Sequence, residues 1–403
     1  MTNKHAALRK LAFLAILLAM PAGSAFAQDV TAVAERLKAL ATGQGLELGW
    51  SAVTGDASTM VLEGVTVKGA GETDAMALGN VTLTGITEKD GGYVVDTLAT
   101  APFSMVEQGV SVEMSPVIVK GLSIPAENAA DPMTSFTMYQ SASLDSLSVK
   151  MGGKTAFALQ GLSGTVTPPE AGSPMQFAGG VTNFSTDLSL IEDPSVRPYI
   201  DGLGYSQLDG NIKIAGSWQP TDGRWSMSQY DIAINDVGTL GLTIDLGGMT
   251  PGFIKAANEL STKMADAPEG TDTSAQQTQL MGMLQDATFH GASLKFSDDS
   301  LTDRAVKLVA MLQGAQPADV VTMAKAAIPF AMMQFQMGEL AGTITPAVNA
   351  FLDDPKSIEI TAAPPAPVTF ARISEVSMAT PSDSAATTNA IWSLLGIKVN
   401  ANQ

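Results

Sequence analysis

Residues 230–246 read YDIAINDVGTLGLTIDL, and this stretch decides the fold. Apolar residues recur at every second position, with Thr and Asp between them and Gly or Asn where the alternation breaks. Because successive side chains of a strand point to opposite faces, this pattern predicts strands with one covered and one wet face. Strands of that kind belong to antiparallel sheets, since parallel strands read as continuous apolar runs.

The same alternation extends over residues 46 to about 247. A small residue followed by alternating apolar and polar positions recurs there at irregular spacing, which argues against a propeller or solenoid of fixed period. The pattern suits a long meander in which glycines sit at bends or bulges of a curved sheet. The other stretches that carry the alternation are 61–67, 81–83, 110–114, 117–124, 144–149, 157–166 and 208–214.

Helix signals dominate residues 250–403. Thr250-Pro251 is an N-cap followed by proline at the first helical position, and capping residues or prolines open further helices at 274, 300, 317 and 345. Strands return at 287–296, 358–360, 368–376 and 396–399, and a last helix covers 388–395. We therefore predict an α+β fold, in which a long curved antiparallel sheet carries a cluster of helices from the C-terminal half.

The first 27 residues are typical of a secretory signal peptide. Lys4, Arg9 and Lys10 precede a ten-residue apolar run, and Ala25-Phe26-Ala27 forms a small-residue cleavage site. We predict cleavage after Ala27, a periplasmic protein and no transmembrane helix in the mature chain; an uncleaved signal anchor is the alternative. The predicted organisation is a signal peptide (1–27), an N-terminal helix (28–45), a β-rich region (46–249) and a helix-rich region (250–403).

Composition excludes several functional classes. The chain has 403 residues, with 40 acidic and 22 basic side chains, and its net charge of −18 argues against nucleic-acid binding. It contains no cysteine, which excludes disulfide scaffolds, thiol catalysis, iron–sulfur clusters and cysteine-based zinc sites. The sequence also lacks a phosphate-binding loop and a dinucleotide fingerprint. We accordingly expect no cofactor, no metal site and no enzymatic activity.

Three residues are candidates for a catalytic role. His290 is the single histidine of the predicted mature chain and lies in a predicted strand, where a structural hydrogen bond accounts for it better than a catalytic triad does. Asp298 and Asp299 adjoin a strand–helix junction. They could serve as paired carboxylates, but acidic residues near a helix N-terminus are favoured by the helix dipole alone.

Residues 326–337, AAIPFAMMQFQM, form a methionine-rich segment that is apolar on nearly all sides. Such a helix is usually buried at the centre of a protein. Methionine-rich surfaces also adapt to varied apolar partners, because thioether side chains repack readily. Phe330, Met333 and Met337 fall on one helical face, and we predict that these three contact an apolar ligand or a partner protein.

Several stretches of the chain carry a resemblance to known proteins. They are Trp50, Leu62-Glu63-Gly64-Val65, Leu78-Gly79-Asn80-Val81, the run 292–298, Leu301-Thr302-Asp303-Arg304, Phe351-Leu352-Asp353-Asp354-Pro355 and 364–368. In these stretches the chain resembles the AsmA-like and YdgA-like proteins of the Gram-negative envelope. The resemblance implies a long, curved antiparallel sheet, sometimes forming an apolar groove, and a role in envelope homeostasis or lipid handling. It assigns a chemical role to none of these residues.

Three functional hypotheses follow. The first is a non-enzymatic periplasmic protein that shelters lipid or other apolar ligands in a β-groove. The second is a structural or assembly factor that binds another envelope protein through a strand edge or the segment 326–337. The third is a hydrolase that uses Asp298 and Asp299. Alternation alone does not separate the first two, because an open apolar face and one filled by the protein's own helices require the same inward positions.

Overall fold

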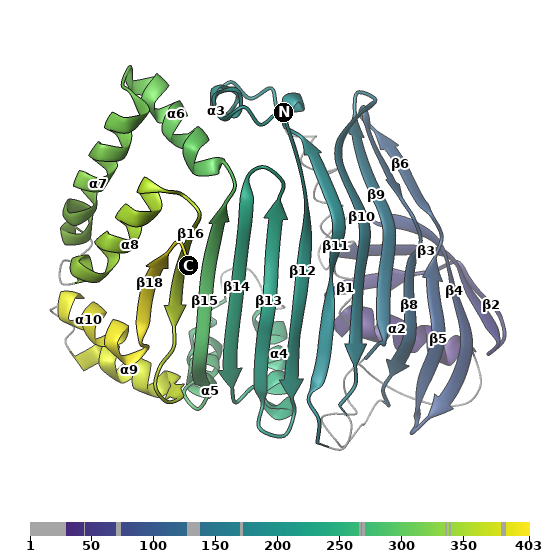
Figure 1. The fold of residues 1–403 in the computed structure, drawn as a ribbon. Coiled ribbons are helices and arrows are strands. Elements are labelled where there is room, and N and C mark those ends of the chain that lie inside the picture. Colours follow the sequence, from purple (N-terminus) through teal and green to yellow (C-terminus); the bar gives the residue numbers. More distant parts are fainter. Residues whose placement is uncertain are drawn as a thin grey trace. The chain divides into compact units, whose positions relative to one another are not determined.

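The structure, a computed structural model, describes residues 30–43, 45–69, 74–126, 138–169, 172–265, 267, 271–334, 337, 340–379 and 384–403. The predicted signal peptide lies outside the described residues. Helices and antiparallel strands are combined in the described part, which confirms the predicted α+β class (Figure 1).

The chain divides into two compact units. We call Met1–Phe184 with Ile254–Thr271 the N-terminal unit, and Ser185–Phe253 with Asp272–Gln403 the C-terminal unit. The predicted boundary at residue 249 separates strand-rich from helix-rich sequence. The compact units do not follow that boundary, because the strands just before it pair with strands of the helix-rich part.

The N-terminal unit contains helix α2 (Val30–Gly43) and a meander of antiparallel strands. Strand β3 pairs with both β1 and β2 and then with β4, β4 with β5, β5 with β8, and β9 with β7, β8 and β10. The strands are β1 (Leu46–Gly49), β2 (Ala52–Gly55), β3 (Thr59–Gly69), β4 (Met76–Lys89), β5 (Gly92–Thr100), β6 (Phe103–Glu107), β7 (Val110–Met114), β8 (Val117–Ile124), β9 (Ser141–Met151), β10 (Lys154–Thr167) and β11 (Met175–Asp187).

Helix α2 covers one face of this sheet. Val33, Leu37 and Leu40 form the predicted helical stripe and are buried against alternate residues of the strands, such as Met60 and Leu62 of β3. Spacings of three and four residues place these side chains on one side of a helix, and a spacing of two places theirs on one side of a strand. The result is a contiguous buried hydrophobic core.

Two glycines produce an irregularity between β3 and β4. Leu62 pairs with Val81, but the register shifts before Val65 pairs with Gly79. Gly64 (φ +59°) and Gly79 (φ +77°) adopt left-handed backbone conformations, which cost little only without a Cβ. The prediction that glycines mark bulges in the meander is confirmed at these positions.

One charged side chain is fully buried beneath α2. Arg36 is 0% exposed, and its Nη1 donates to the Pro125 carbonyl at 2.6 Å, while Nη2 donates to the Gly91 carbonyl at 3.5 Å. Its guanidinium also lies 5.8 Å from the centre of the Tyr93 ring. Arg36 therefore ties the helix to the β4–β5 turn and to the end of β8.

The C-terminal unit pairs its strands in the order β12, β13, β14, β15, β16, β18, and β17 pairs with the other end of β15. Its strands are β12 (Gln207–Gln219), β13 (Arg224–Ile234), β14 (Gly238–Gly247), β15 (Thr288–Asp298), β16 (Ser357–Ala362), β17 (Val368–Thr369) and β18 (Ile397–Ala401). The helices between and beside them are η3 (Leu188–Leu190), α3 (Arg197–Leu203), α5 (Ser274–Leu284), α6 (Leu301–Gln313), α7 (Pro317–Gln334), α8 (Ala341–Asp353), α9 (Phe370–Ala379) and α10 (Ser384–Leu394). Helix α4 (Pro251–Ala265) belongs mostly to the N-terminal unit.

Two sequence predictions in this unit are wrong. The strand predicted over 368–376 is limited to β17, and α9 follows at once, capped by the Thr369 hydroxyl, which accepts from the Arg372 backbone N–H at 3.1 Å. The helix predicted to open at Thr345-Pro346 begins instead at Ala341, and Pro346 lies inside it. Burial of Ile344 in the first turn favours the earlier start, so packing outweighs the proline signal.

Replacing Arg36 with alanine tests the role of the buried guanidinium. Arg36→Ala leaves two backbone carbonyls without this donor and opens a cavity under α2, so we expect the free energy of unfolding to fall by about 3 kcal/mol. Urea denaturation followed by circular dichroism measures the change. Lys38→Ala is the matched control, because Lys38 is an exposed cation on the same helix, 5.3 Å from the Trp50 ring. Equal destabilisation by both variants would contradict the assigned role.

Candidate apolar binding face

The methionine-rich segment is not buried at the centre of the protein. Phe330 and Met333 lie on α7 with 67% and 63% of their surfaces exposed, and Val320 is the buried residue of this helix. Central burial, the usual arrangement for so apolar a helix, is therefore wrong here. Met337 lies beyond the last residue of α7 and is half-buried, so the structure places only Phe330 and Met333 on the helix.

The three catalytic candidates occupy structural positions. Asp298 Oδ1 accepts from the backbone N–H and from the hydroxyl of Thr302, each at 2.8 Å, and so caps the first turn of α6. Asp299 follows it and is exposed. His290 Nε2 lies 3.0 Å from the Thr288 hydroxyl on the same strand. Asp298 therefore serves as a helix cap, and these contacts do not pair it with Asp299 or with His290.

The strand register of the C-terminal unit gathers aliphatic side chains on one face. Ile212, Ile232, Leu240, Phe296 and Ile358 are successive cross-strand partners from β12 to β16. Directly opposite residues point to the same side of a sheet, so these five form one continuous row. The row crosses five neighbouring strands without a polar residue.

A second row runs parallel to the first, two residues further along each strand. Leu242 pairs with Leu294, Leu294 with Ile360, and Ile360 with Val399 of β18. Because side chains two positions apart share a face, this row lies beside the first. We call the two rows and the adjoining Ile244 the apolar face; its residues are Ile212, Ile232, Leu240, Leu242, Ile244, Leu294, Phe296, Ile358, Ile360 and Val399.

The centre of the apolar face is open to solvent. Leu240 is 42% exposed, Leu294 is 44% exposed and Ile360 is 45% exposed, and the three lie on the adjacent strands β14, β15 and β16. The other seven residues are half-buried. Single exposed aliphatic residues are common on protein surfaces, but a contiguous group on one sheet face is typical of a site that binds a ligand or a partner protein.

The opposite face of the same strands is polar. Asp231, Gly241, Lys295, Glu359 and Asn400 form a row of cross-strand partners one residue out of step with the apolar rows. On the same side, the Thr243 and Ser293 hydroxyls lie 2.8 Å apart. The sheet therefore has one polar face, and it shows its aliphatic side chains on the other.

Helix α8 covers one end of the apolar face. The rings of Phe351 on α8 and Phe296 on β15 meet edge to face, with centroids 6.5 Å apart. Asn402 Nδ2, just after β18, donates to the Ala350 carbonyl at 3.0 Å and holds the helix beside that strand. Figure 1 shows α8 next to β18, with α9 and α10 towards the strand's other end. Leu294 and Ile360 lie towards the middle of their strands, beyond the end that Phe351 covers.

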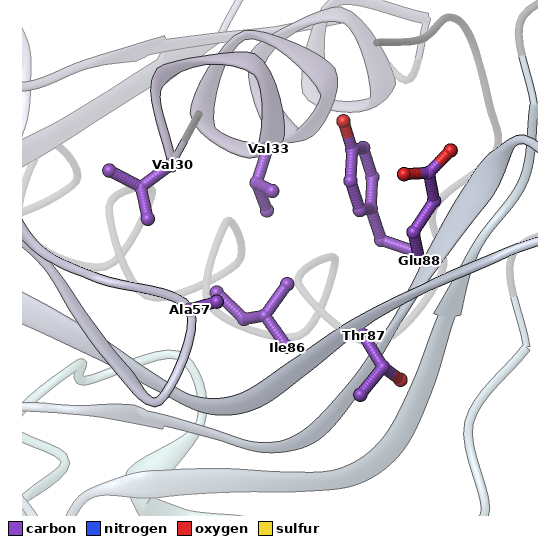
Figure 2. A pocket seen from close by; sticks show the side chains of 7 residues that line it. Val30, Val33, Ala57, Ile86, Thr87 and Glu88 are labelled. Atoms are coloured by element: carbon purple, nitrogen blue, oxygen red, sulfur yellow. The ribbon is translucent and has the colours of Figure 1, made fainter. Parts of the chain in front are cut away.

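The N-terminal unit contrasts with this arrangement, because α2 and the apolar side chains of β1, β3, β4, β5 and β8 bury one another. A cavity of about 240 Å³ lies at the N-terminal end of α2, between the helix and the β4–β5 hairpin. Figure 2 shows Val30 and Val33 of the helix facing Ala57 and Ile86 across it. The remaining lining residues are Thr87, Glu88 and Tyr93.

Perturbed ionisable groups are not found on the apolar face. Hydrogen bonds from neighbouring serine and threonine groups lower the pKa of Asp56, Asp193 and Asp272, all of which lie in exposed turns. The hydrogen-bonded carboxylate of Asp245 raises the pKa of Arg224, and burial raises that of Tyr139. Each shift follows from a local turn, an ion pair or burial. Within the described residues, no group of three acidic or histidine side chains is arranged to hold a metal ion.

Comparisons with known proteins add one match. Residues 231–402 match the model of a protein family described as "Uncharacterized protein". A comparison with curated proteins gave no match. The matched range begins in β13 and ends just after β18, so it contains Leu240, Leu294 and Ile360. Across the described helices, none has the length and apolar character that a membrane span requires.

Removing the Asp298 carboxylate tests its role as a helix cap. We expect Asp298→Ala to lower the free energy of unfolding by about 1 kcal/mol, because Thr302 loses its acceptor at the start of α6. Thermal denaturation measures this effect. Asp299→Ala is the matched control, since its side chain is exposed, and we expect it to unfold like the unmodified protein. A larger loss of stability in the Asp299 variant would contradict the assignment.

Proposed function

We propose that this chain is an exported, non-enzymatic protein of the cell envelope that shelters the acyl chain of a lipid on the apolar face of its C-terminal unit. The observation that carries this proposal is the exposure of Leu240, Leu294 and Ile360 on three adjacent strands. The predicted signal peptide supports export to the periplasm. The resemblance to AsmA-like and YdgA-like envelope proteins supports a role in lipid handling.

The energetics favour an apolar occupant. Burying a leucine or isoleucine side chain completely is worth about 1.5–3 kcal/mol, so covering three that are a little under half exposed is worth about 3 kcal/mol. The half-buried neighbours add to this gain. A polar ligand would recover none of it, because the face offers no hydrogen-bonding side chain.

The dimensions of the face also fit an extended hydrocarbon chain. Six strands at a spacing of about 4.8 Å span about 24 Å from β12 to β18. Half of a hydrocarbon core of about 30 Å, the depth that one lipid tail occupies, is about 15 Å. One tail therefore fits along the two apolar rows with room at either end.

A paired substitution on the apolar face tests the proposal. Leu294 and Ile360 are direct cross-strand partners, so Leu294→Gln/Ile360→Gln places two amides at the centre of the face. We expect affinity for 1-N-phenylnaphthylamine, an apolar fluorescent probe, to fall roughly 30-fold, from about 1 kcal/mol lost at each position. Lipid extracted from the natively purified protein and measured by mass spectrometry should fall with it.

The matched control lies one residue further along the same two strands. Lys295→Gln/Glu359→Gln changes a directly paired couple on the opposite face and leaves the net charge unchanged. It should retain both probe binding and co-purified lipid. The proposal fails if the unmodified protein carries no lipid and binds no probe, or if both double variants lose binding equally.

The second candidate function is a structural or assembly factor, and the exposed surface of α7 favours it. Phe330 and Met333 lie on this helix, and Met323, two turns before Phe330, is 49% exposed. Flexible methionine side chains suit an apolar helix of another envelope protein. This surface is separate from the apolar face, so the two functions are testable independently.

Photo-crosslinking in cells tests the second candidate. A photoreactive amino acid at Phe330 or Met333 should give one dominant adduct that Met323→Glu weakens several-fold, because a charge in an apolar contact is costly. The control position is Met281 on α5, which is 58% exposed. An identical adduct pattern at all three positions, or none at any, would exclude this function.

A further inference from the structure

The ligand of the apolar face is further defined by the charges around it, on the assumption that the proposed function holds. We infer that the apolar face selects a lipid whose head group carries no net negative charge. The inference rests on where the basic side chains of the C-terminal unit point and on what already binds them.

Basic residues on the strands point away from the apolar face. Lys213, Lys295 and Lys398 each lie between two residues of apolar character on β12, β15 and β18. Successive side chains of a strand point to opposite sides, so all three amines project from the polar face. Arg224 lies at the start of β13 and forms a bidentate pair with Asp245, at 2.9 and 2.7 Å.

Basic residues on or beside α6, α7 and α9 have acidic partners. Lys307 pairs with Asp303 at 2.5 Å, Lys325 with Asp353, and Arg372 with Glu375 at 2.9 Å. A phosphate would have to displace a carboxylate from each of them.

The other cations near these helices are also engaged. On α3, Arg197 pairs with Asp201 at 2.6 Å. Lys356, just before β16, pairs with Asp354 at 2.5 Å. Arg304 on α6 donates to the carbonyls of Leu203 and Gly204, each at 3.1 Å, and its guanidinium lies 4.2 Å from the centre of the Tyr205 ring. Among the described helices of this unit, each basic side chain therefore already has a partner, and none is free to bind an anionic head group.

The net charge of the whole chain acts in the same direction. With a net charge of −18, the protein repels anionic lipids and anionic membrane surfaces, and salt screens this repulsion over about 10 Å at 0.1 M. An uncharged or zwitterionic head group experiences no such repulsion. The tail contributes the apolar contact, and the head group decides whether the lipid is accepted.

Two lipids with identical tails test the inference. Diheptanoyl phosphatidylcholine is zwitterionic and diheptanoyl phosphatidylglycerol is anionic, and each is titrated as a monomer against bound 1-N-phenylnaphthylamine on the full chain. At low salt we expect the choline lipid to bind at least about tenfold more tightly. Raising the salt concentration should narrow the difference by strengthening binding of the glycerol lipid alone.

The outcomes separate this inference from the proposed function. If the anionic lipid binds as tightly as the zwitterionic lipid at low salt, the inference is overturned, while lipid binding itself stands. If neither lipid displaces the probe, the proposed function fails and the inference fails with it. A difference that does not change with salt would also overturn the electrostatic argument.

A positive charge introduced on the apolar face provides a second test of the selection against anionic head groups. Ile360→Lys and Ile360→Gln both remove an exposed aliphatic side chain, so a comparison between the two isolates the added amine. We expect the lysine variant to bind the anionic lipid about fivefold more tightly than the glutamine variant. The two variants should bind the zwitterionic lipid alike. No gain for the anionic lipid would overturn the inference.

Discussion

Cross-strand register is the constraint on which the C-terminal unit depends. Each strand alternates apolar and polar residues, so a shift of one position in any pair would move a whole row of side chains to the other face. The observed register aligns Leu294 with Ile360 and Lys295 with Glu359. That alignment keeps the aliphatic rows continuous and places the charged residues in rows of their own. The apolar face is a product of register as much as of composition.

The two units use the same kind of sheet in different ways. In the N-terminal unit, α2 covers the apolar side of the strands and buries even a charged residue, Arg36, between them. In the C-terminal unit, α8 reaches Phe296 through Phe351 but does not bury Leu240, Leu294 or Ile360. A sheet whose apolar face is covered is a stable scaffold, whereas a partly covered sheet leaves apolar surface that can bind a ligand.

The sequence predicts the strands well because alternation is a local signal. Residues 230–234 lie in β13 and residues 238–246 in β14, as expected, and the stripe on α2 is also confirmed. The segment 368–376 was interpreted wrongly because its spaced apolar residues fit a helical face as well as a strand. The short helix α3 carries no stripe long enough to be recognised in the sequence.

The candidate site was harder to predict, for a physical reason. Alternation shows that Leu240, Leu294 and Ile360 share a side of the sheet, but it contains no information about whether another element covers that side. The methionine-rich composition of α7 predicts that Phe330 and Met333 contact an apolar ligand or a partner protein, and both side chains are exposed. No local pattern distinguishes a buried apolar helix from an exposed one, because exposure depends on residues far away in the sequence.

The pairing order of the C-terminal sheet has a consequence for how it folds. Helices α4 and α5 separate β14 from its partner β15, and α6, α7 and α8 separate β15 from β16. Each of these closures brings together distant parts of the chain, so assembly is expected to be slow compared with that of hairpins. Until β15 docks, β14, which carries Leu240 and Leu242, presents a free edge. A nascent chain in that state is prone to aggregation, and a chaperone that binds apolar strands would protect it.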